Sequence, residues 1–257
     1  MIRRIIHIAR REWLEQIRQP AMLGVIITLY GLVALLVLIS LLMLQNMQGN
    51  PGQLATVLNT GDDPAAFIEL FVGGTVNAYN FLLYSQFLGI AAVLAGHAVL
   101  HDRQCGTLTF LLLAPVRRTE LLIGKVIGAI GPPFVLYLLI SGPAAVLASC
   151  LEVTAPFAAQ LPGNPAWWVA FLIGGPTWAF FIGSICTIVS SLAHDVRTAQ
   201  QGVWFVVFFA TLICGFLLTW ALPYGVIAQL GVAGLAAFGA GATQLIGATL
   251  MSRDVSR

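Results

Sequence analysis

Residues 21–44 of this 257-residue chain read AMLGVIITLYGLVALLVLISLLML, and the run contains no charged side chain. A helix that crosses the hydrocarbon core of a bilayer needs about 20 consecutive apolar residues, so this run predicts a membrane-spanning helix. Five further windows also lack Asp, Glu, Lys and Arg: 78–100, 126–149, 167–192, 200–222 and 226–250. The sequence therefore predicts an all-α integral membrane protein with six transmembrane helices, built as a single transmembrane domain over residues 1–257.

The overall composition leads to the same class of protein. The chain is 59% hydrophobic and only 9% charged, whereas soluble domains are about 25% charged. The four cysteines are scattered along the chain and imply no disulfide framework.

The basic residues predict the orientation in the membrane. Five of the twelve precede the first window, four lie in 101–125, one separates the fourth and fifth windows, and two are at the C-terminal end. The segments 45–77, 150–166 and 223–225 have none. Lys and Arg concentrate in cytoplasmic loops, so we expect both termini and the loop 101–120 in the cytoplasm and the loop 45–77 outside. The expected location is the inner (plasma) membrane of a bacterium, as a multi-pass protein.

Residues 1–20 predict an amphipathic helix at the cytoplasmic interface. Apolar side chains recur at helical spacing, arginines occupy much of the remaining surface, and Pro20 marks the turn into the membrane. Such a helix anchors a chain to the lipid surface. Contact with a cytoplasmic partner is the alternative interpretation.

Several kinds of chemistry are not predicted for this chain. The six windows lack the charged residues of an ion relay, and no GxxxxGK[ST] loop for nucleotide phosphates is present. His97, His101 and Cys105 stand at i, i+4 and i+8, but one helix face rarely supplies a closed metal site. We expect no cofactor, no metal, no catalytic residue and no nucleic-acid partner, so the energy for any uphill transport would come from another subunit.

Two polar or aromatic stripes have two interpretations each. Asn80 and Tyr84 share a face of the second window, and Trp204 and Phe208 share a face of the fifth. Polar groups in lipid are costly unless they face protein or water. Each stripe therefore either holds helices together or lines a path for a substrate.

Residues 101–125, HDRQCGTLTFLLLAPVRRTELLIGK, place leucines in the middle of a basic loop. Thr107 is expected to cap a short helix that ends at Pro115, and Thr119 to cap the next helix. The apolar face of the short helix would consist of three leucines: Leu108, Leu111 and Leu112. An apolar face on a cytoplasmic loop predicts a partner that buries it.

The order Gly106-Thr107-Leu108, Ala114-Pro115, Arg118, Glu120 and Gly124-Lys125 resembles the loop between helices two and three in permease subunits of ABC exporters of the ABC-2 type. The amphipathic N-terminus and the six-helix layout also resemble that family. The loop departs from the usual pattern: Asp102 stands where Glu is typical, Gln104 and Cys105 replace charged residues, and Ala114 replaces a serine. These departures concern how the loop contacts an ATPase.

The resemblance implies a coupling surface for a separate cytoplasmic ATPase, which would bind ATP and magnesium. Its expected residues are Arg103, Gly106, Thr107, Leu108, Leu111, Leu112, Pro115, Arg117, Arg118 and Glu120. It also implies a second permease copy, in a homodimer or in a pair of like permeases, with a central path lined by the second and fifth helices. The path residues would be Asn80, Tyr84, Trp204 and Phe208.

Two alternatives to a general exporter remain open in the sequence. One is the permease of a metal-centre or haem-maturation ABC system that works with a periplasmic partner. The other is a membrane scaffold that transports nothing.

Overall fold

The computed structural model describes residues 2–18, 20–48, 64–106, 117–151, 154, 157, 160–193 and 195–254. These residues form helices and no strand. The α-helices are α1 (Ile2–Ile17), α2 (Pro20–Gln48), α4 (Pro64–Gln104), α6 (Arg118–Ser149), α7 (Pro165–Val169), α8 (Gly175–Leu192), α9 (Val196–Trp220) and α10 (Gly225–Asp254). A π-helical turn, Ala170–Gly174, joins α7 to α8, and a 3-10 turn, Leu222–Tyr224, precedes α10.

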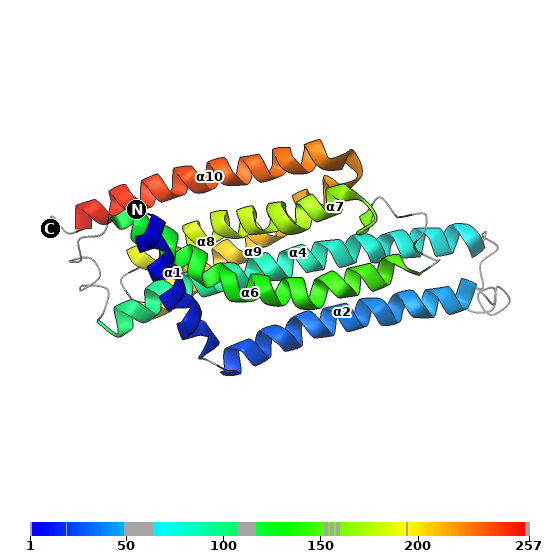
Figure 1. Cartoon of the computed structure of the whole chain (residues 1–257), viewed down its shortest axis with the longest axis horizontal. Helices are drawn as coiled ribbons and strands as arrows, with labels where there is room; N and C mark the ends of the chain where they lie inside the picture. The colour runs from blue at the N-terminus through cyan, green and yellow to red at the C-terminus, as the bar shows by residue number, and fades with distance from the viewer. Residues whose placement is uncertain are drawn as a thin grey trace.

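The long helices lie side by side, and α1 crosses one end of them (Figure 1). Five stretches are long and apolar enough to cross a membrane: Ile26–Met43, Leu70–Asp102, Arg118–Ser149, Pro165–Leu192 and Arg197–Leu250. The last stretch contains two helices, α9 and α10, between which the chain turns back at Leu222–Tyr224 (Figure 1). Both chain ends lie at the end of the bundle where α1 crosses (Figure 1).

An aromatic stack joins the helices at the centre of the bundle. The ring centroid of Tyr137 on α6 lies 4.6 Å from that of Phe87 on α4 and 4.2 Å from that of Phe171 in the π-helical turn. Trp167 stacks on Phe171 at 4.6 Å. All four side chains are fully buried, so stacking and burial together fix α4, α6 and α7 relative to one another.

The loop expected over residues 45–77 is shorter than the sequence predicted. Helix α2 continues to Gln48 and α4 already begins at Pro64, so most of the expected loop belongs to helices. Only 49–63 lies outside the described residues. The sequence window at 78–100 marked the most apolar part of α4 rather than its ends.

Candidate functional site

The predicted coupling loop follows the end of α4. Gly106 has φ +68°, a left-handed conformation that glycine adopts easily and that commonly ends a helix. This explains the glycine of the Gly-Thr-Leu motif. Five of the predicted coupling residues lie outside the described residues, as does the side chain of Arg103. These five are Thr107, Leu108, Leu111, Leu112 and Pro115.

The three remaining coupling residues lie at the start of α6. Arg117 is exposed, Arg118 is half-buried, and Glu120 is buried. Arg117 is the N-cap residue of α6, so the prediction that Thr119 caps this helix is wrong. Glu120, in the first turn, instead accepts a hydrogen bond from the backbone N–H of Arg117 at 3.4 Å, because a first-turn carboxylate can reach back to the free N–H groups of a helix.

A buried lysine connects three helices close to this loop. Lys125 on α6 is 1% exposed. Its Nζ donates to Glu12 Oε1 on α1 at 2.7 Å and to the Ala98 carbonyl oxygen on α4 at 3.1 Å, and it also pairs with Asp102 on α4. We call Glu12, Asp102 and Lys125 the ion cluster. The cluster links α1 to both helices that flank the predicted coupling loop.

The ion cluster holds two carboxylates and one ammonium group. For the pKa of Glu12, burial has a larger effect than the neighbouring ammonium group. Burial raises the pKa of the Glu12 carboxyl above its ordinary value, although the Lys125 ammonium opposes this shift. Two further contacts extend the cluster toward the surface. Arg11 Nη2 lies 3.8 Å from Asp102 Oδ1, and His101 Nε2 lies 2.9 Å from Glu15 Oε1.

Glycines on α6 allow α1 to approach closely. A Cβ atom at Gly128 would lie 2.6 Å from Glu12 Cβ and 2.7 Å from the Ala9 carbonyl oxygen. A Cβ atom at Gly124 would lie 2.8 Å from Ile8 Cβ. Glycine at these positions lets the two backbones come together, as small residues do in packed membrane helices.

The α1 helix therefore has an inner and an outer side. Ala9 and the buried Glu12 face the bundle, and the partly exposed ring of Trp13 lies against Gly131 of α6, whereas Ile6 and Ile17 remain exposed. The exposed side suits the lipid surface predicted from the sequence. The side against α6 was not predicted, although the spacing of Gly124, Gly128 and Gly131 is a signal for helix packing.

The predicted path residues do not share one surface of the chain. Asn80 is fully buried, accepts a hydrogen bond from Trp167 Nε1 at 3.0 Å and donates to the Gln160 carbonyl oxygen at 2.8 Å. Tyr84 is also fully buried in the core, whereas Trp204 and Phe208 are 59% and 60% exposed on α9. Asn80 and Tyr84 are thus buried between helices, and the hydrogen bonds of Asn80 hold α4 against its neighbours.

Trp204 also borders a cavity of about 340 Å³ between α2, α4 and α9. Around it, α9 exposes further aromatic side chains, among them Phe205 and Phe209. Within the described part of the chain, no group of three His, Cys, Asp or Glu side chains could hold a metal ion. His101 Nε2 lies 3.7 Å from Cys105 Sγ, and these two residues form no larger cluster with His97.

The helices and their apolar lengths define the class of protein: a multi-pass membrane protein made of helices. A family profile described as ABC-2 family transporter protein matches residues 6–230. The chain therefore belongs to the ABC-2 family of transporter proteins, and it is a permease, the membrane component of an ABC transporter. This family associates with an ABC ATPase and is generally not catalytic itself. No curated protein and no solved structure matches the chain.

Proposed function

We propose that this chain is the transmembrane subunit of an ATP-driven exporter, which couples ATP hydrolysis by a separate cytoplasmic ATPase to movement of a substrate across the membrane. The ion cluster is the observation that carries the proposal. It joins α1, the end of α4 and the start of α6 through one buried ammonium group. A force applied by an ATPase to the loop between α4 and α6 would therefore move three helices together.

The proposed topology has six spans with both termini in the cytoplasm. The spans are α2, α4, α6, α7 with α8, α9 and α10. An even number of spans is supported by the two chain ends, which lie at one end of the bundle (Figure 1). The cytoplasmic assignment of that end is supported by the basic residues at both termini and in 101–125.

We place the second permease copy against α9. Its exposed aromatic residues, including Trp204 and Phe208, would bury against the same helix of the partner or line the path between the copies. Asn80 and Tyr84 lie inside the chain and are better assigned to holding α4 in place. The alternative, a metal-centre or haem-maturation system with a periplasmic partner at the external face, is favoured by no side chain among the described residues.

The test of the coupling surface compares Leu111→Asp with Arg117→Ala. Burying a leucine contributes about 1.5–3 kcal/mol, whereas an exposed ion pair contributes about 1 kcal/mol or less. We expect Leu111→Asp to detach or uncouple the ATPase, and Arg117→Ala to have little effect. The measurement is co-purification of the co-expressed ATPase in detergent, followed by ATP turnover of the complex.

Membrane insertion is the control, because neither change touches a predicted span. Both variants should reach the membrane in wild-type amounts. Normal co-purification and normal turnover in Leu111→Asp would show that the leucines do not contact the ATPase, and the proposed coupling surface would be wrong.

A further inference from the structure

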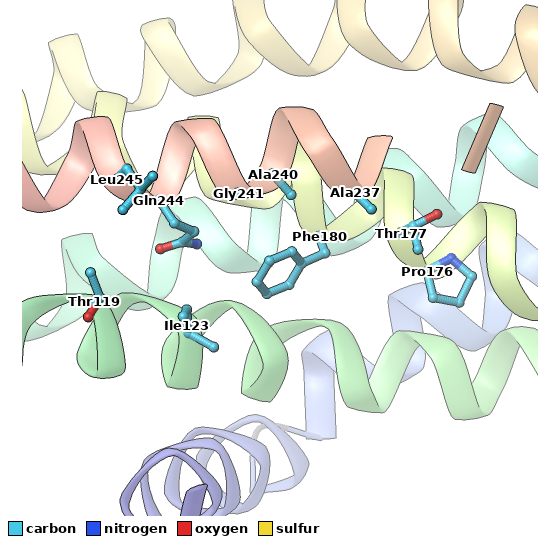
Figure 2. A pocket seen from close by; sticks show the side chains of 10 residues that line it. All are labelled: Thr119, Ile123, Pro176, Thr177, Phe180, Ala237, Ala240, Gly241, Gln244 and Leu245. Atoms are coloured by element: carbon cyan, nitrogen blue, oxygen red, sulfur yellow. The ribbon is translucent and has the colours of Figure 1, made fainter. Parts of the chain in front are cut away.

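A groove separate from the ion cluster and from α9 opens between α6, α8 and α10. Its volume is about 680 Å³, within the ~300–1,000 Å³ range of small-molecule sites. Ten residues line it: Thr119, Ile123, Pro176, Thr177, Phe180, Ala237, Ala240, Gly241, Gln244 and Leu245 (Figure 2). None of the ten is charged, so the groove offers no counter-charge to an ionic ligand of one sign.

One buried acceptor in the groove lacks a partner. Gln244 is 6% exposed, and its side chain extends from α10 into the groove, toward Ile123 and Thr119 (Figure 2). Its Nε2 donates to Ser184 Oγ at 2.7 Å, whereas its Oε1 is buried and accepts no hydrogen bond. A buried carbonyl oxygen without a donor is costly, so the site is incomplete without a ligand that supplies one.

The orientation of this amide follows from its neighbour. The hydroxyl of Ser184 already donates to the Phe180 carbonyl oxygen at 2.6 Å. Ser184 Oγ can therefore only accept from Gln244, which fixes Nε2 on Ser184 and leaves Oε1 for the groove.

Gln244 lies at the depth of the interface helix. A Cβ atom at Gly247 would lie 3.3 Å from Leu122 of α6, so these two residues are at one level. Gln244 is three residues before Gly247 on α10, so it lies about 4.5 Å farther into the bundle. This is the level at which α1 crosses Gly124 of α6. Amphipathic helices such as α1 lie at the boundary between headgroups and acyl chains.

The part of the groove beyond Gln244 is apolar and runs along α10. From Leu245 to Ala237 it extends about 12 Å, at about 1.5 Å per residue, past Phe180 toward Pro176 (Figure 2). It is also open at Gly241, where a Cβ atom would meet nothing within 4 Å. An acyl chain fits such a channel, because it needs apolar walls and no hydrogen bonds.

We propose that this groove binds one phospholipid of the phosphatidylethanolamine type. The headgroup of such a lipid has no net charge and carries a hydrogen-bond donor. The ammonium group donates to Gln244 Oε1, and one acyl chain lies along Phe180 and Gly241. The absence of charged lining residues favours a zwitterionic headgroup over an anionic one. Phosphatidylcholine has no donor, so its headgroup cannot satisfy the Gln244 oxygen.

The test is native mass spectrometry of the full chain in detergent, titrated with phosphatidylethanolamine or with phosphatidylcholine. Wild type should bind the first phosphatidylethanolamine roughly two- to tenfold more tightly than phosphatidylcholine, the range that one net hydrogen bond gives. Gln244→Met keeps the length of the side chain but removes the acceptor, so this preference should fall to about onefold. Equal binding of the two lipids by wild type would overturn the proposal.

A second variant tests occupancy of the groove. Gly241→Leu adds a side chain to the channel at a position where a Cβ atom meets nothing within 4 Å, and it should weaken the first phosphatidylethanolamine by about tenfold or more. Gly231→Leu is the matched control, because Gly231 is also on α10 with open space around its Cβ position but lies outside the groove; it should bind lipid as wild type does. If Gly241→Leu keeps its lipid, or if it instead dissociates a dimer, the groove is not a lipid site.

Discussion

Lys125 is the residue on which the contact between α1 and the bundle depends. It is a buried cation between two buried carboxylates, and its three bonds reach two other helices. Buried ion pairs gain little over apolar packing, but removal of one partner leaves an uncompensated charge in a site that excludes water. Loss of Lys125 should therefore cost more stability than loss of the charge on Glu12.

Replacement of Lys125 by methionine should destabilise the α1 contact by about 3–5 kcal/mol, because the buried Glu12 then loses its cation. The exposed Arg11 guanidinium, 3.8 Å from Asp102 Oδ1, is the cation that remains nearby. Glu12→Gln should cost markedly less. Its amide oxygen still accepts from Lys125, and burial already disfavours the charged carboxylate, as the raised pKa of Glu12 indicates. Limited trypsin cleavage at Arg10 and Arg11 in detergent measures the release of α1. Equal cleavage rates in the two variants would show that the cluster does not hold this helix.

At the scale of elements, α1 packs closely on α6 because its side chains lie over glycines of α6. The nearest neighbours of a Cβ atom at Gly128 would be Glu12 Cβ and the carbonyl oxygen of Ala9, neither of which can rotate away as the end of a long side chain can. A side chain at this position would have to push the whole helix outward.

Gly128→Leu should therefore displace α1 and remove Glu12 from Lys125. Hydrogen exchange measured by mass spectrometry should show faster exchange of the α1 amides, because helices that lose their packing open more often. Gly24→Leu on α2 is the control, since a Cβ atom there meets nothing within 4 Å. Wild-type protection of α1 in Gly128→Leu would contradict the close approach of the two helices.

The sequence predicted the helices better than it predicted their ends or their contacts. Hydropathy locates residues that prefer hydrocarbon, but a helix continues for as long as its backbone hydrogen bonds do, so α4 begins at Pro64 and not near residue 78. The ion cluster could not be predicted, because Glu12 and Lys125 are 113 positions apart in the sequence. Asp102 and Lys125 could be singled out by their motif, but Glu12 looked like one more residue on the polar side of an amphipathic helix.

At the scale of the whole molecule, the helices leave both chain ends on one side of the bundle (Figure 1). Helix α1, which carries five arginines with the residue that follows it, and the start of α9 lie toward that side, and the turn between α9 and α10 lies at the other (Figure 1). This common side of the termini and the arginines supports the proposal that it faces the cytoplasm.

Cysteine labelling in intact cells tests this topology. An impermeant thiol reagent should label Thr60→Cys at once, and Thr198→Cys only after the membrane is permeabilised, because residues 45–77 are expected outside and 193–199 inside. The background must lack the native cysteines, since Cys105 and Cys150 are exposed. Labelling of Thr198→Cys from outside would refute the six-span arrangement.

The separation between Glu12 and Lys125 also matters while the chain is being made. Glu12 leaves the ribosome 113 residues before its partner, a delay of roughly 6 to 23 s at about 5–20 residues per second. Asp102 follows Glu12 after 90 residues and Lys125 only after 113. Until Asp102 has been made, α1 has neither partner and can rest only on the lipid surface through Ile6, Trp13 and Ile17. Its contact with α6 can form only after α6 has been made, so the first helix to be synthesised reaches its final place after α2 and α4 have been synthesised.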